Sequence, residues 1–118
     1  MYYDKRGLAV TASSQAAVDA YDDSVDEFLA SGRDAAKLLQ RITEVDPDMI
    51  MGQVLRGYFY MLPSHAHLVP LSKEALATAQ RLAGDATPRE RRHVDALAAW
   101  HEGDIRRMNA IWDAILID

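Results

Sequence analysis

The chain has 118 residues, of which 49% are hydrophobic and 26% are charged, and its formal net charge is −5. This length suits one domain, and the acidic balance argues against general nucleic-acid binding, which requires a basic surface. No cysteine is present, which excludes disulfides and thiolate sites, and no apolar run approaches the roughly 20 residues of a membrane-spanning helix. Because residues 1–6 do not lead into the apolar core of a secretory signal, we expect a cytoplasmic protein.

Six helices are predicted, over residues 14–30, 34–44, 47–62, 72–83, 88–101 and from 105 onward. The first carries an apolar stripe of Val18, Tyr21, Val25 and Phe28. The boundaries of the first four come from residues that favour helix ends, namely Ser13 or Ser14, Gly32, the Asp46–Pro47 pair, Pro63, Ser72 as a cap and Gly84.

The start of the fifth helix has the clearest local signal. Thr87 and Glu90 have the spacing of a capping box, and Pro88 falls at the first helical position. Gly103 should end this helix, and Asp104 should cap the sixth.

One pattern of apolar residues recurs three times. Its members are Ala35, Leu39 and Ile42, then Ala75, Ala79 and Leu82, then Met108, Trp112 and Ile115. Offsets of three and four residues put each trio on one helix face, and the recurrence from 35 to 75 to 108 indicates stacked helical hairpins. We therefore predict an all-α domain, with residues 1–12 as an N-terminal arm and three antiparallel hairpins over residues 13–46, 47–86 and 87–118.

The second unit resembles the tetratricopeptide repeat, which places small and aromatic residues at set offsets. The residues that carry this resemblance are Gly57, Tyr60, Ala75, Ala79 and Leu82. It implies a short right-handed solenoid. A narrower resemblance, carried by Asp46–Pro47, Met51–Gly52, residues 87–94 and Trp112 to Leu116, is to the N-terminal part of the tetratricopeptide repeat protein 38 family. Members of that family are several-fold longer, so the chain would be either a fragment or a short relative.

Two surfaces are candidates for binding. If the first helix of each hairpin lines a concave face, a groove for a peptide or partner helix would comprise Val54, Tyr58, Met61, His93, Leu97, Trp100 and His101. The same residues could instead fill the core between layers, and the sequence leaves both alternatives open. The last helix is apolar around more than one stripe, which favours self-association through Ile105, Met108, Ile111, Trp112, Ile115 and Leu116.

The residues that could carry chemistry are few. His65 and His67 have no nearby acidic or cysteine partner for a zinc site, and His93 and His101 are about 12 Å apart along one helix, too far for one metal. We therefore assign no catalytic, cofactor-binding or metal-binding residue.

Charge is organised in three groups. The first helix is acidic, and Arg33, Lys37 and Arg41 form a basic stripe on the next, so these faces could meet across the hairpin, be solvated, or bind a basic partner. Five arginines gather near the third hairpin, Arg89, Arg91, Arg92, Arg106 and Arg107, where they could form surface pairs or receive a carboxylate or phosphate.

Two functions fit this sequence. The first is an interaction scaffold that binds a protein or peptide and itself, and that binds neither nucleic acid nor membrane. The alternative is the N-terminal domain or short relative of an enzyme whose chemistry lies outside this chain or at a dimer interface. We expect the scaffold, because no catalytic arrangement is recognisable.

Overall fold

The computed structural model describes residues 2–30, 35–61 and 67–117. Over these residues it contains six α-helices: α1 (Gln15–Ala30), α2 (Ala35–Val45), α3 (Ile50–Tyr60), α4 (Val69–Leu82), α5 (Pro88–His101) and α6 (Ile105–Ile117). A 3₁₀ turn, η2 (Ala83–Asp85), links α4 to α5. The all-α prediction is confirmed. None of the described helices is both long and apolar enough to cross a membrane.

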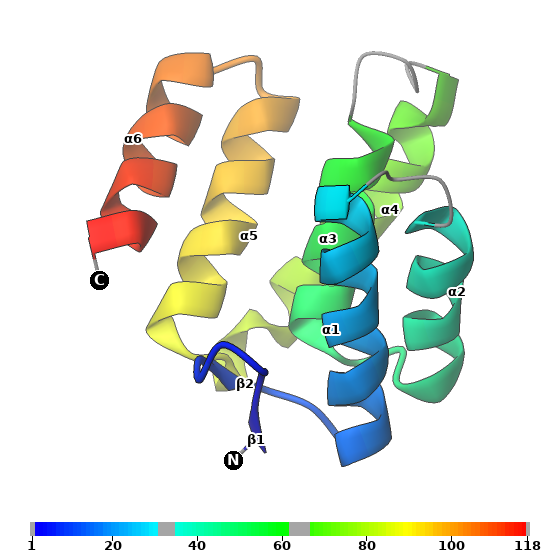
Figure 1. Ribbon diagram of the computed structural model, residues 1–118. Helices are drawn as coiled ribbons and strands as arrows, with labels where there is room; N and C mark the ends of the chain where they lie inside the picture. The colour runs from blue at the N-terminus through cyan, green and yellow to red at the C-terminus, as the bar shows by residue number, and fades with distance from the viewer. Residues whose placement is uncertain (1, 31–34, 62–66, 118) are drawn as a thin grey trace.

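The helices pack as three consecutive pairs, α1 with α2, α3 with α4, and α5 with α6 (Figure 1). Helix α3 also contacts α2 and α5, and α4 contacts α5, so the α3–α4 pair lies between the other two. This arrangement confirms the predicted order of three stacked hairpins. It leaves α6 packed chiefly against α5 at one end of the stack.

Two glycines on α3 allow neighbouring helices to approach closely. A Cβ at Gly52 would lie 2.6 Å from Cγ2 of Ile42 on α2, and a Cβ at Gly57 would overlap the side chain of Leu97 on α5. Ile42 and Leu97 are themselves almost fully buried. The absence of side chains at these two positions therefore sets how α3 packs against both neighbouring pairs.

The capping predictions for α5 and α6 are confirmed. The Thr87 hydroxyl accepts a hydrogen bond from Glu90 N at 3.2 Å, and the Glu90 carboxylate accepts one from Thr87 N at 2.9 Å. Gly103 follows α5 with a φ of 76°, a left-handed conformation that favours glycine. Asp104 Oδ1 accepts a bond from Arg107 N at 3.1 Å at the start of α6.

Two predicted helix starts are wrong. Helix α3 begins at Ile50 and not at Pro47, because the Asp46 carboxylate accepts from Asp48 N within a turn and from Ser13 N across the fold. Helix α4 begins at Val69, with Pro70 in its first turn, so Ser72 lies inside the helix and is not its cap. The Ser72 hydroxyl is fully buried and donates to the carbonyl oxygen of Gly57 at 2.8 Å.

The N-terminal arm contains a small antiparallel hairpin that the sequence analysis did not predict. Its strands, β1 (Tyr2–Tyr3) and β2 (Ala9–Val10), pair Tyr2 with Val10 and Tyr3 with Ala9. The buried Asp4 carboxylate accepts from Arg6 N and Leu8 N, both at 2.9 Å, and so closes the turn between the strands. Strands of two residues are too short to give a period that can be read from sequence.

The arm is held against the helices by the carboxylate of Glu90, which has no exposed surface. Besides capping α5, Glu90 accepts from Thr11 N at 2.9 Å and from the Thr11 hydroxyl at 2.7 Å. Hydrogen bonds to a charged group satisfy a carboxylate that would otherwise be costly to bury. The arm is therefore an integral layer over the start of α5.

Candidate functional site

Three groove residues, Tyr58, His93 and Trp100, meet Trp112 of the predicted self-association set where α3, α5 and α6 pack together. We call Tyr58, His93, Trp100 and Trp112 the aromatic–imidazole cluster. Their ring centroids lie 5.9 Å apart for Tyr58–His93 and for Tyr58–Trp112, and 6.1 Å apart for Trp100–Trp112. All three pairs are edge-to-face, an arrangement that the electrostatics of aromatic rings favour.

Hydrogen bonds in the cluster centre on the Tyr58 hydroxyl. It donates to the carbonyl oxygen of His93 at 3.1 Å and accepts from Trp112 Nε1 at 3.3 Å. His93 Nδ1 lies 3.0 Å from the Tyr58 hydroxyl oxygen. Because the hydroxyl proton is already donated to the His93 carbonyl, Nδ1 must carry the proton in this contact and donate it to the hydroxyl oxygen. His93 Nε2 is buried without a hydrogen-bond partner in the structure.

The cluster is uncharged at neutral pH. Burial lowers the pKa of His93 to about 4, and the Arg89 guanidinium lowers it further in the same direction. Burial also raises the pKa of the Tyr58 hydroxyl well above its usual range. Because neither group titrates near pH 7, the pair is suited to holding helices together and not to proton transfer at that pH.

The predicted groove needs a correction. Val54 and Leu97 have no exposed surface, because Val54 belongs to the main core and Leu97 occupies the space above Gly57. Neither can contact a partner in this conformation. Tyr58, Met61, His93, Trp100 and His101 are partly exposed. For Val54 and Leu97 the alternative of core packing is therefore the correct one.

His101 belongs to a separate contact at the far end of α5. Its Nε2 lies 2.7 Å from Ser72 Oγ, whose proton is donated to Gly57, so the imidazole donates to the hydroxyl. Partial burial, followed by the charge of Lys73, lowers the pKa of His101. The Ser72 hydroxyl thereby links α3, α4 and α5, a role that residue type and spacing alone do not distinguish from helix capping.

The apolar residues of α6 divide into an inner and an outer set. Met108 is buried, and Ile111 and Trp112 pack with it against Ala96 and Ala99 of α5. Ile105 is 47% exposed and Leu116 is 84% exposed, while Ile115 is half-buried. Met108 therefore serves the internal packing of the third hairpin, which corrects its assignment to a self-association surface, whereas Ile111 and Trp112 are only partly buried against α5.

The five arginines of the third hairpin have different surroundings. Arg91 donates to the carbonyl oxygens of Ala83 and Gly84, both at 2.9 Å, and so satisfies the end of the preceding helix. Arg107 pairs with Glu102 at 3.5 Å on the surface, and Arg106 is exposed. Arg89 and Arg92 lie one turn apart on α5.

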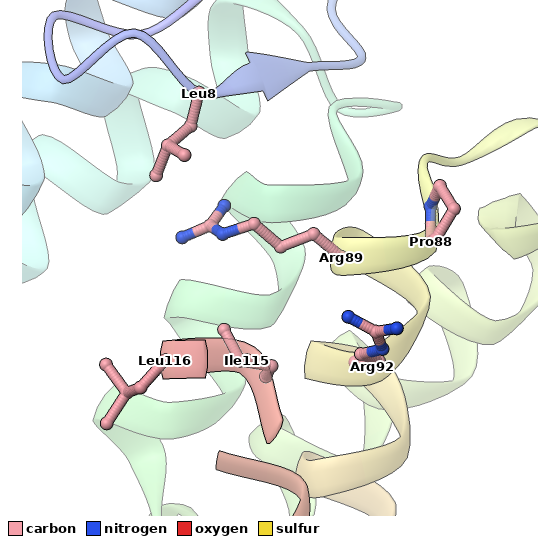
Figure 2. A pocket seen from close by; sticks show the side chains of 6 residues that line it. All are labelled: Leu8, Pro88, Arg89, Arg92, Ile115 and Leu116. Carbon is pink, nitrogen blue, oxygen red and sulfur yellow. The ribbon is translucent and has the colours of Figure 1, made fainter. Parts of the chain in front are cut away.

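Arg89 and Arg92 line a cavity of about 460 Å³ between the arm, the start of α5 and the end of α6 (Figure 2). Its other lining residues are Leu8, Pro88, Ile115 and Leu116, and we call it the Arg89 pocket. The gathering of five arginines near the third hairpin indicated this region in the sequence. The participation of Leu8 had no sequence signal, because the arm is held near the pocket by contacts with residues distant in sequence, among them the hydrogen bonds of Thr11 to Glu90.

The acidic surface of α1 is partly neutralised by the arm. Asp26 pairs with Lys5 and, at 3.2 Å, with Arg6, and the hydrogen bond from Lys5 lowers the pKa of the Asp26 carboxyl. This pairing was not among the alternatives drawn from the sequence. Arg33, the first member of the basic stripe, and His65 lie outside the described residues, as does the side chain of Phe28.

No group of three histidine or acidic side chains among residues 2–30, 35–61 and 67–117 is arranged to hold a metal ion. Fold and site together define a small all-α protein of three packed helical hairpins with an ordered N-terminal arm. No protein-family model matches the chain, and no solved structure gives a significant match. The resemblance to tetratricopeptide repeats thus stays a prediction.

Proposed function

We propose that this chain is a tetratricopeptide-like interaction module that works in the cytoplasm, binding a second copy of itself and a protein or peptide partner. The observation that carries the proposal is the exposed apolar edge of α6. Ile105 and Leu116 are 47% and 84% exposed. Large apolar side chains that remain open to water along one helix favour association.

The two side chains belong to one edge of the helix. They are eleven residues apart, which is close to three turns at 3.6 residues per turn, so they project in nearly the same direction. Met108 and Trp112 lie beside this edge and anchor α6 to α5. Burying each exposed side chain in a dimer would contribute roughly 1.5–3 kcal/mol before the cost of association.

Sedimentation equilibrium of the native chain and of an Ile105→Asp, Leu116→Asp variant tests the self-association. We expect a native dimer that dissociates in the variant. Ala110→Asp is the matched control, because Ala110 is exposed on α6 but lies away from this edge. A native chain that is monomeric at every concentration would contradict the proposal, and so would a variant that dimerises as well as the control.

The test of partner binding uses the same surface variants as the test of self-association. Substituting Tyr58, His93 or Trp100 would disrupt interior hydrogen bonds and ring contacts, so a loss of binding could reflect unfolding. Affinity capture with the Ile105→Asp, Leu116→Asp variant avoids this, since both positions are exposed. A protein retained by the native chain and by Ala110→Asp, but lost by the double variant, would support binding at this edge.

An enzymatic role has one observation in its favour, the lowered pKa of His93. Its imidazole lines none of the three cavities described for this structure, and its Nδ1 is occupied by Tyr58. The interaction module is therefore the better-supported function.

A further inference from the structure

The Arg89 pocket contains a cation without a counter-charge. Nη1 of Arg89 is buried and has no hydrogen-bond partner in the structure. Among the described residues, no carboxylate lies within ion-pair distance of this guanidinium. An uncompensated guanidinium is unfavourable in a partly apolar site, and an anion placed beside it would relieve that cost.

The walls of the pocket restrict the kind of anion. Leu8 comes from the arm and Ile115 and Leu116 from α6, and Figure 2 shows Arg89 extending from the first turn of α5 toward Leu8. These side chains present aliphatic surface around the cation. A volume of about 460 Å³ falls within the range of pockets that hold small organic ligands.

We propose that the Arg89 pocket binds a monocarboxylate with an apolar body, its carboxylate on the Arg89 guanidinium and its apolar part against Leu8, Ile115 and Leu116. A guanidinium matches a carboxylate through two parallel hydrogen bonds. A single negative charge matches the Arg89 guanidinium, whereas a phosphate monoester brings nearly two. Arg92, on the same wall, adds positive potential. Leu116 belongs to both this wall and the proposed self-association edge, whereas Ile105 belongs to the edge alone, so Ile105→Asp tests self-association without altering the pocket.

Isothermal titration calorimetry with octanoate and 1-octanol tests the role of the charge, because the two probes have the same chain length. We expect octanoate to bind the native chain at least about tenfold more tightly than octanol, as the loss of a hydrogen bond to a charged group implies. Two tetrapeptides ending in leucine, one with a free and one with an amidated carboxyl group, distinguish a protein C-terminus from a free acid as the source. Binding of either carboxylate over its uncharged counterpart supports the proposal, and binding of neither overturns it.

Arg89→Met is the decisive variant, because methionine keeps an apolar stem and removes the charge. The carboxylate that binds the native chain should bind this variant about tenfold more weakly or worse. Arg106→Met is the matched control, since Arg106 is exposed on α6 and does not line the pocket, and its affinity should stay within about twofold of native.

Arg89→Met should also fold normally, since it leaves no partner group unsatisfied. Thermal unfolding of the ligand-free variant verifies this before titration. Equal carboxylate affinity in the native chain and in Arg89→Met would overturn the proposal. Leu116→Asp offers an independent variant for the same measurement: it places a negative charge on the wall, and unchanged octanoate affinity there would also contradict the assigned site.

Discussion

The carboxylate of Glu90 accepts two hydrogen bonds from Thr11, one from its backbone nitrogen at 2.9 Å and one from its hydroxyl at 2.7 Å. The same carboxylate caps α5 through Thr87 N. The buried Glu90 side chain thus stabilises the start of α5 and also fixes the N-terminal arm, which is distant in sequence. Removing it should cost more than a helix cap is worth.

We predict that Glu90→Ala lowers the free energy of unfolding by about 3 kcal/mol, and Thr87→Ala by about 1 kcal/mol. The difference arises because Thr87→Ala breaks only one side of the capping box, whereas Glu90→Ala also leaves the Thr11 donors unpaired. Urea denaturation followed by circular dichroism measures both values. Equal losses in the two variants would mean that the bonds between Thr11 and Glu90 contribute nothing to stability.

Glycine-to-alanine substitutions should have opposite effects at two positions. Gly57→Ala should destabilise the protein by about 1–3 kcal/mol, because the added Cβ overlaps Leu97. Gly84→Ala should be neutral or stabilising by up to about 1 kcal/mol, because a Cβ added at Gly84 would meet no neighbouring group within 4 Å and the φ of Gly84 is not positive. Thermal unfolding compares the two. A Gly57→Ala protein as stable as Gly84→Ala would contradict the close packing of α3 on α5.

His93 should make the protein less stable in acid. Its folded pKa of about 4 lies below the ordinary value of 6.5, so the unfolded state binds the proton first as pH falls. The contribution of His93 to stability is therefore complete above about pH 6.5 and decreases toward pH 4. Proton NMR of the imidazole should show it still neutral at pH 5.

The variant His93→Asn isolates this contribution. It should be less stable than the native chain at pH 7.5. The difference in the free energy of unfolding should narrow by about 2 kcal/mol at pH 5, since only the native chain has a histidine at this position whose protonation favours the unfolded state. A gap that is independent of pH would show that His93 is protonated to the same extent in both states. Asp and Glu residues common to both proteins cancel in the comparison.

Substitution of Ser72 distinguishes an interior residue from a helix cap. A cap tolerates glycine better than alanine, whereas a helix interior does not. We expect Ser72→Ala to cost about 1–2 kcal/mol, because the His101 imidazole loses its partner and the Gly57 carbonyl keeps only its bond from Met61 N, and Ser72→Gly to cost about 1 kcal/mol more. Thr78→Ala is the control, because its hydroxyl bonds Glu74 O in its own helix. The reverse order of the two Ser72 variants in urea denaturation would restore the capping interpretation.

The predictions from sequence succeeded where the signal was local. Thr87, Glu90 and Gly103 act on backbone groups within a few residues, so their types and spacing alone located the ends of α5. Asp46 and Ser72 carry the same kind of signal, but their side chains bond Ser13 and Gly57, which are distant in sequence. A pattern of residue types cannot say which acceptor a polar side chain will find in the fold.

The candidate surfaces were subject to the same limit. Helical spacing placed His93 and Trp100 on one face of α5, and the expected stacking of hairpins brought Tyr58 of α3 beside them, as in the structure. The spacing could not say whether that face points to water or to another helix. Whether this face is exposed or buried depends on Gly57, whose missing side chain allows α5 to approach α3 and bury Leu97.

The bond between Thr11 and Glu90 also has a consequence for the order of folding. The two residues are separated by 79 positions, so the arm is synthesised long before its acceptor exists. At about 5–20 residues per second, this delay is roughly 4–16 s on the ribosome. The α1–α2 and α3–α4 pairs form mainly from contacts within each pair and can fold during that time. The bonds between Thr11 and Glu90 form only once α5 has emerged, whereas Lys5 and Arg6 of the arm can pair with Asp26 as soon as α1 is made.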